Sequence, residues 1–200
     1  MPHAVSLTSA PASSAVDEIR SLSRPFATLF GFLFLSMLTI CIVFVLAALL
    51  YGGPSLRMTP DHTQLLIMPD LTEQVLASTI AIADMPLKTR LVGIVSLGIL
   101  QWGSLTMIFF QFRALFRLYE QGVVFATGNV ACIRRLGFWL IVWGAAPTVG
   151  HQLCELTGVY DEGWLRASSL AAVVLGGLLY VIGRVMNLGR EIELERASFV

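Results

Sequence analysis

RALFRLYEQGVVFATGNVACIRRLG, residues 113–137, is a polar segment between two long apolar runs. The flanking runs, residues 91–112 and 136–156, each match the roughly 20 helical residues that cross a hydrocarbon core of about 30 Å. The segment is therefore predicted to be a loop that joins two membrane spans and lies outside the bilayer.

The composition of the whole chain places it in the membrane class. Of its 200 residues, 56% are hydrophobic, whereas soluble domains contain about 45–50%. Thirteen basic and 13 acidic residues cancel, so no basic surface for nucleic acid is predicted. Cys41, Cys132 and Cys154 are too widely spaced for a disulfide framework or a zinc knuckle, and are interpreted as small apolar residues.

The apolar runs predict an all-α integral membrane four-helix bundle. The first run contains no charged side chain and ends at Gly52-Gly53-Pro54. Pro147 lies inside the third and is expected to kink it by removing one amide hydrogen bond. The predicted spans are residues 26–51, 91–112, 136–156 and 167–185. They form a transmembrane domain, residues 26–187, between cytoplasmic tails at residues 1–25 and 188–200.

Small residues predict where helices approach one another. The second span carries Gly93, Gly98 and Gly103, and the fourth carries the pair Gly176-Gly177. Such positions let helix backbones pack closely in a membrane. Gln101, which lies mid-span, is expected to form an interhelical hydrogen bond.

The segments before the first two spans are predicted to lie outside the bilayer. Residues 16–23 are expected to form a short helix on the membrane surface that ends before Pro25. Between the first two spans, Leu56–Thr59 and Gln64–Met68 are candidates for a hairpin. Residues 71–83 follow with capping-box spacing and are expected to form a short helix. This extracytoplasmic hairpin and helix are the predicted insert between spans one and two.

Basic residues near the span ends predict the orientation. Nine of the 13 lysines and arginines fall in the N-terminal segment, the central loop and the C-terminal tail. Because cytoplasmic loops carry the excess of these residues, both termini and the central loop are expected in the cytoplasm. The predicted location is the cell (inner) membrane, which the chain crosses several times.

The central loop and the tail hold the candidate docking residues. Arg113, Arg117 and Glu120 share one helical face, and Gly122 is expected to end that helix. Thr127 or Asn129 is a candidate cap for the next helix. The candidate residues for docking a partner are Arg117, Tyr119, Glu120, Asn129, Arg134, Arg135 and Glu195.

Within this loop and tail the chain resembles a known family. Residues 116–119 (FRLY), Gly122, Phe125 and Asn129 resemble the shared loop of a bacterial family of small four-span membrane proteins, domain of unknown function 2975. The tail adds a similar closing pattern of Gly189, Ile192, Glu195 and Phe199-Val200. The resemblance implies an association with small helix-turn-helix regulators, and it carries no catalytic residues.

A second candidate site lies at the outer end of the third span. His151, Cys154 and Glu155 are spaced so that they can face a metal together with His62 of the insert. Haem between two spans is not predicted, since only one span carries a histidine. The absence of charged residues between the span ends argues against a pump, and GxSxG, HExxH and P-loop patterns are absent. No cofactor is predicted.

The sequence leaves two functions open. The first is a non-enzymatic regulatory or accessory membrane protein that docks a cytoplasmic regulator through the central loop and the tail. The alternative is a binder or sensor of a small ligand, metal or lipid at the outer end of the bundle. A structural subunit of a larger complex, or a homo-oligomer, is compatible with either sequence pattern.

Overall fold

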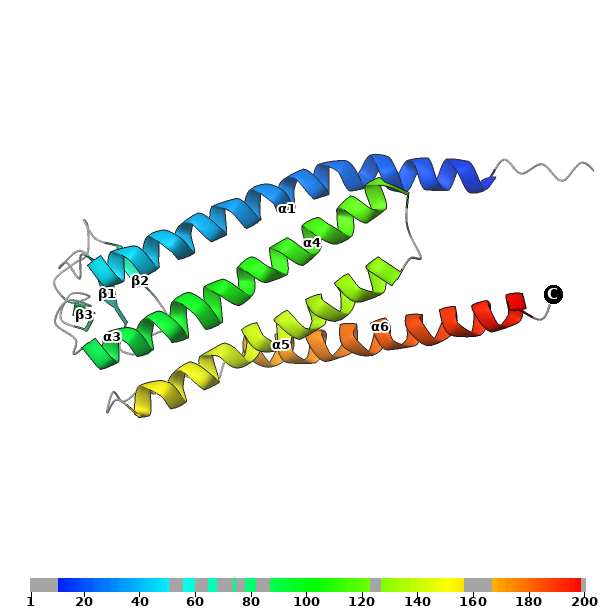
Figure 1. Ribbon diagram of the computed structural model, residues 1–200. Coiled ribbons are helices and arrows are strands. Elements are labelled where there is room, and N and C mark those ends of the chain that lie inside the picture. The colour runs from blue at the N-terminus through cyan, green and yellow to red at the C-terminus, as the bar shows by residue number, and fades with distance from the viewer. Residues whose placement is uncertain are drawn as a thin grey trace, which may run out of the picture.

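The computed structural model describes residues 11–50, 56–59, 65–67, 74, 78–81, 87–122, 127–156 and 167–198. Long helices dominate this part of the chain, and a small sheet lies at one end of them (Figure 1). The helical elements are α1 (Pro11–Leu50), α3 (Leu87–Gly93), η2 (Ile94–Gly103), α4 (Ser104–Glu120), α5 (Thr127–Glu155) and α6 (Ala167–Ser198).

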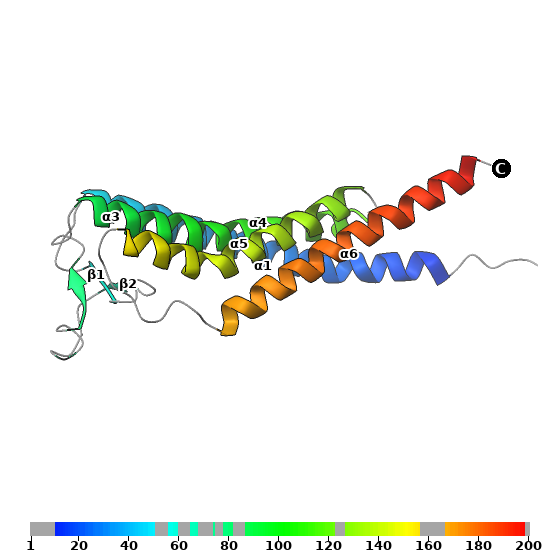
Figure 2. The same ribbon diagram turned by 90° about the horizontal axis from the view of Figure 1, so that it is seen from below.

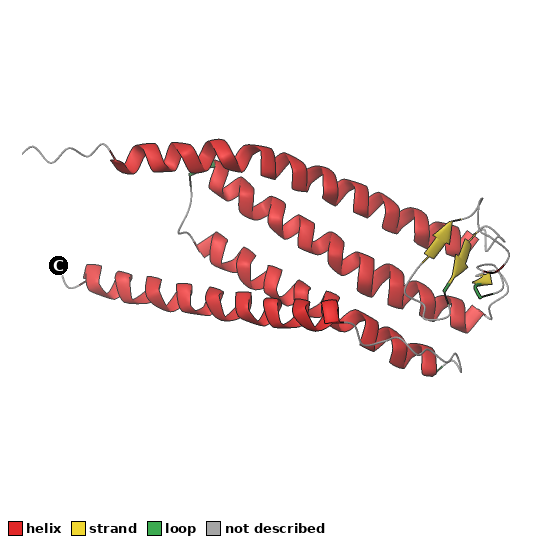
Figure 3. Cartoon of the chain, turned by 180° about the vertical axis from the view of Figure 1, so that it is seen from behind, coloured by secondary structure: helices red, strands yellow, loops and turns green. Residues whose placement is uncertain are grey.

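Four helical segments in the described part of the chain are long and apolar enough to cross a membrane. They overlap the four predicted runs, at Glu18–Leu49, Arg90–Glu120, Thr127–Leu153 and Ala167–Gly189. The second and fourth extend beyond the predicted runs, whereas the first and third begin earlier and end before the predicted ends at residues 51 and 156. The second combines α3, η2 and α4 into one continuous rod (Figure 3). The structure therefore supports the coarse prediction of an all-α bundle with four candidate membrane spans.

The helices pack in chain order. α1 lies along α4, α4 along α5, and α5 along α6. α6 begins beside the middle of α5 and crosses it at an angle (Figure 2). The start of α1, the end of α4, the start of α5 and the end of α6 all lie at one end of the molecule, and the sheet lies at the other (Figure 1). We refer to these as the loop end and the sheet end.

α1 corrects one prediction, because it runs through Pro25 instead of ending before it. A proline inside a helix removes one backbone hydrogen bond, because it has no amide hydrogen, and costs about 3 kcal/mol. Tertiary packing on both sides of Pro25 offsets this cost. Arg24 precedes it and binds Glu120 of α4, while Phe26 follows it and stacks on Phe116.

The second span contains an unpredicted stretch of π-helix, η2. The extra residue in each turn changes which side chains face the neighbouring helices. The regular α-helix resumes at Ser104. Its buried hydroxyl donates to the carbonyl oxygens of Leu100 and Gln101, and the hydrogen bond to Gln101 is 3.0 Å long.

The predicted hairpin is present at the sheet end. β1 (Leu56–Met58) pairs antiparallel with β2 (Leu65–Ile67), as expected. A third strand, β3 (Ile80–Ala81), pairs on the other edge of β1 and contradicts the helix predicted over residues 71–83 at these two positions. Isoleucine favours a strand, and pairing with Arg57 and Met58 supplies hydrogen bonds that local helix signals could not predict.

Met58 fixes this sheet to the helices. Its side chain is 2% exposed and packs in a cluster with Phe44, Ala48 and Ile94. Gly93 makes room for it, because a Cβ there would lie 3.2 Å from the Met58 methyl carbon. Gly98 likewise faces Phe44 at 3.2 Å, so two of the three glycines noted in this span are at close contacts.

Glycines set the contact between α5 and α6. A Cβ on Gly144 would lie 2.6 Å from the Ser169 carbonyl oxygen, and one on Gly176 equally close to that of Gly137. A Cβ built on Gly177, in contrast, would have no neighbouring atom within 4 Å. Of the predicted pair, only Gly176 therefore lies in the interface.

Candidate functional site

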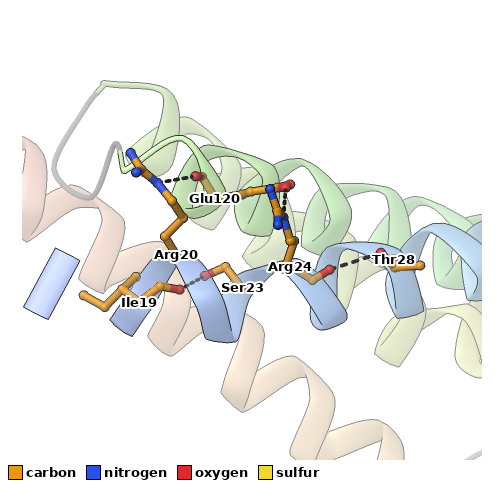
Figure 4. Close-up of polar contacts among 6 residues, drawn as sticks. All are labelled: Ile19, Arg20, Ser23, Arg24, Thr28 and Glu120. Atoms are coloured by element: carbon orange, nitrogen blue, oxygen red, sulfur yellow. Dashed lines mark hydrogen bonds and ion pairs between the residues drawn. The ribbon is translucent and has the colours of Figure 1, made fainter. Parts of the chain in front are cut away.

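Glu120, the last residue of α4, joins that helix to the start of α1. Its backbone oxygen accepts a hydrogen bond of 3.1 Å from Nε of Arg20. Its carboxylate Oε1 lies 3.1 Å from Nε of Arg24 (Figure 4). Since Arg20 and Arg24 are four residues apart, they lie on one face of α1. One glutamate thus holds two arginines in place.

Two hydroxyl groups of α1 donate to backbone carbonyls of the same helix beside these arginines. The hydroxyl of Ser23 donates to the Ile19 carbonyl at 2.6 Å, and that of Thr28 donates to the Arg24 carbonyl at 3.1 Å (Figure 4). Ser23 is buried against the rest of the molecule. The arginines therefore extend from a helix that is well defined on both sides of Pro25.

A run of stacked aromatic rings lies below the glutamate, toward the middle of the molecule. Phe30 of α1 stacks on Phe112 at 4.8 Å and on Phe116 at 5.5 Å between ring centroids. Phe26 stacks on Phe116 at 5.2 Å, and Tyr119 meets the same ring edge-on at 6.1 Å. Such pairs contribute about 0.5–1.5 kcal/mol each beyond area burial. This ladder fixes how α4 is rotated relative to α1.

The polar residues that the sequence placed on one face of α4 make different contacts. The side chain of Arg113 lies over Gly31 of α1, and Glu120 faces the arginines of the same helix. Arg117 is exposed and forms no ion pair with any described residue. The docking candidate Glu120 is therefore already engaged within the chain, whereas Arg117 is available to solvent.

These groups surround a polar hollow of about 510 Å³, lined by Arg20, Arg24, Arg117, Glu120 and Gln121. We call it the arginine hollow. Three arginines and one glutamate give it an excess of positive charge. A surface of this kind favours a negatively charged group over a neutral or cationic one.

Gly122 closes the helix beside the hollow, as predicted. Its φ of 77° lies in the left-handed region, and its amide donates to the Tyr119 carbonyl at 2.9 Å. This bond is one of the pair that defines a common glycine-ended helix terminus. Residues 123–126, which follow Gly122, lie outside the described residues.

The remaining docking candidates have different surroundings. Asn129 is fully buried in the first turn of α5, which begins at Thr127. Arg134 lies across the Tyr180 ring of α6 at 5.6 Å, and Arg135 is exposed beside it. The side chain of Glu195 lies outside the described part of the chain. The structure thus brings Arg117, Tyr119 and Glu120 together, with Arg134 and Arg135 on a separate helix.

At the sheet end, His151 is 7% exposed and its Nε2 lies 3.3 Å from Glu155 Oε1. Gly150, the residue before His151, packs against η2, since a Cβ built on Gly150 would lie 3.1 Å from the Ser96 Cβ. The side chain of Cys154 and all of His62 lie outside the description. Among the described residues, no group of three or more histidine, cysteine or acidic side chains is placed to hold a metal.

Arg20 and Arg24 are the site residues that the sequence reading missed. Their sequence signal is the four-residue spacing of Arg20 and Arg24, and a second four-residue spacing relates Phe26, Phe30 and Phe34 on the same long helix. The assumption that Pro25 ends the helix concealed that pattern.

Comparison of the chain with protein-family models, with curated proteins and with solved structures finds no match.

Proposed function

We propose that this chain is a non-enzymatic, multi-pass membrane protein that docks a cytoplasmic partner at its loop end. The observation that carries the proposal is the arginine hollow, in which Glu120 fixes Arg20 and Arg24 while Arg117 stays exposed. An acidic segment of a soluble protein is the partner whose charge complements it. The resemblance to the four-span family favours a small transcription regulator in this role.

The arrangement of the helices supports a docking role. α1 starts at Pro11, well before its apolar run, and α6 continues to Ser198, well after its own. Both extensions lie at the loop end (Figure 1). Helices that continue past the bilayer there offer a partner a surface beyond the headgroups. The inner membrane, with both termini in the cytoplasm, is the location that fits the distribution of basic residues.

The test is recruitment of soluble proteins to membranes that contain the chain. The double variant Arg117→Ala with Glu195→Ala is expected to lose a partner that the wild type recruits. Lys88→Ala is the matched control, since it removes one exposed charge at the sheet end. Recruitment of every partner at wild-type level by the double variant would refute the proposal.

The second candidate function is a small-ligand or metal sensor at the sheet end. The observation that favours it is His151, a buried imidazole next to Gly150, which packs against Ser96 of π-helical η2. π-Helical turns occur frequently at functional sites. Purified protein with a visible absorption band or stoichiometric metal, lost in His151→Ala, would support this function. Colourless, metal-free protein that His151→Ala leaves unchanged would remove it.

A further inference from the structure

A second hollow lies between α5 and α6 near the loop end, apart from the arginine hollow. It has a volume of about 360 Å³ and is lined by Ala131, Arg134, Arg135, Phe138 and Tyr180. This volume falls within the range of about 300–1,000 Å³ that small-ligand sites occupy. Among the described residues, the lining contains two arginines and no carboxylate, so this part of it carries an uncompensated positive charge.

Arg134 is held in place by its surroundings. Its guanidinium carbon lies 5.6 Å from the Tyr180 ring centroid. Its stem passes over Gly183, where a Cβ would come within 2.7 Å of the Arg134 Cγ. Glycine at that position is therefore required for the arginine to lie across α6. The result is a cation whose position is fixed before any ligand arrives.

Arg135, the next residue, is exposed, as Arg134 is. It forms no ion pair with any described residue. A fixed cation and a free cation side by side suit a phosphodiester, which arginine binds through paired N–H donors.

The other wall of the hollow is apolar and lies toward the membrane. Phe138 stands one helical turn further into the apolar run than Arg134 and Arg135, and it is 54% exposed. Tyr180, on the apolar run of α6, is 46% exposed. A soluble anion would leave both rings without a contact, whereas an acyl chain below a headgroup would cover them.

We propose that the hollow between α5 and α6 is a binding site for an anionic phospholipid. Its phosphate is held by Arg134 and Arg135, and the upper part of an acyl chain lies along Phe138 and Tyr180. Basic pockets between membrane helices are a recurrent means of binding anionic headgroups. The site is independent of the partner-docking proposal, because none of its residues lines the arginine hollow.

The test is native mass spectrometry of the full chain in mild detergent, with phosphatidylglycerol or phosphatidylcholine of the same acyl chains. The wild type is expected to retain phosphatidylglycerol preferentially. Arg135→Gln is expected to weaken that binding about fivefold, the effect of one arginine near an anionic surface. Arg117→Gln, an equal charge change at the same end, is the control and is expected to stay within about twofold of wild type.

Tyr180→Leu is the second variant, because it removes the ring under Arg134 without changing charge, and it is expected to weaken phosphatidylglycerol binding as well. Wild-type binding by both variants, or equal binding of the two lipids, would overturn the assignment. A loss of phosphatidylglycerol binding in Arg117→Gln as large as that in Arg135→Gln would show general charge attraction instead of a specific site, and would overturn the assignment too. Displacement of the lipid by inorganic phosphate at equal concentration would show a soluble-anion site and would also overturn it.

Discussion

Gly137 of α5 and Gly176 of α6 lie in direct backbone contact, since a Cβ on either residue would be 2.6 Å from the carbonyl oxygen of the other. No side chain fits between the two helices at this point. In a membrane, where lipid tails weaken the hydrophobic drive between helices, such contact supplies much of the attraction. The crossing of α5 and α6 therefore depends on these glycines.

Gly176→Ala is expected to force the two helices apart and to destabilise the protein by about 1–3 kcal/mol, as overpacking does in closely fitted interiors. Thermal unfolding in detergent measures the effect. The adjacent Gly177→Ala is the matched control, because that position has open space and alanine is the better helix former. Equal unfolding temperatures for the two variants would contradict the interface described here.

Phe30→Leu is expected to destabilise the packing of α1 on α4 by about 1–2 kcal/mol, because it removes two stacked ring contacts at once. Phe32→Leu is its control, since Phe32 is 68% exposed two residues further along. Chemical unfolding in mixed micelles compares them. An effect of Phe32→Leu as large as that of Phe30→Leu would show that the aromatic ladder does not stabilise the helix pair.

Glu120→Gln removes the charge that holds Arg24 and leaves the backbone bond to Arg20 in place. Global stability is expected to change by less than about 1 kcal/mol, because the ion pair is solvent-exposed. The local effect is expected to be larger, with faster hydrogen exchange over residues 18–24. Glu155→Gln at the sheet end controls for the charge change. Unchanged exchange in Glu120→Gln would show that the ion pair does not order the start of α1.

The proposed orientation predicts which positions a membrane-impermeant maleimide reaches. In a chain with its three native cysteines replaced, Lys88→Cys is expected to react in intact cells with a permeabilised outer membrane. Ser21→Cys is expected to react only after lysis. Both positions are exposed in the folded chain, so burial does not interfere. The reverse labelling pattern would invert the orientation and move the loop end out of the cytoplasm.

The sequence predicts the elements whose cause is local. The membrane-length helices follow from runs without charge, and the strands at Leu56–Met58 and Leu65–Ile67 follow from apolar segments around a turn. The end of α4 follows from Gly122, since few other residues adopt its φ of 77° without strain.

What the sequence reading missed depends on contacts between distant residues. Pro25 suggests a helix end, and only the bonds from α1 to Glu120 and the ring stack below it show why the helix continues. Gly176 and Gly177 look alike in the sequence, and only the path of α5 decides which one is in contact. The arginine hollow forms between α1 and α4, and it depends on the continuation of α1 through Pro25 and on how α4 is rotated. The sequence pattern of α4 alone could therefore not predict it.

Site-specific photo-crosslinking at position 121 asks whether a soluble partner binds the arginine hollow while Arg117 is intact. A photoreactive amino acid replaces Gln121, which is exposed and lines the hollow, in one chain and Lys88 in another. The crosslinked products are identified in native membranes by mass spectrometry. The docking proposal predicts a reproducible soluble partner captured from position 121 and not from position 88. Capture of no soluble protein at position 121, or of the same proteins at both positions, would rule the proposal out.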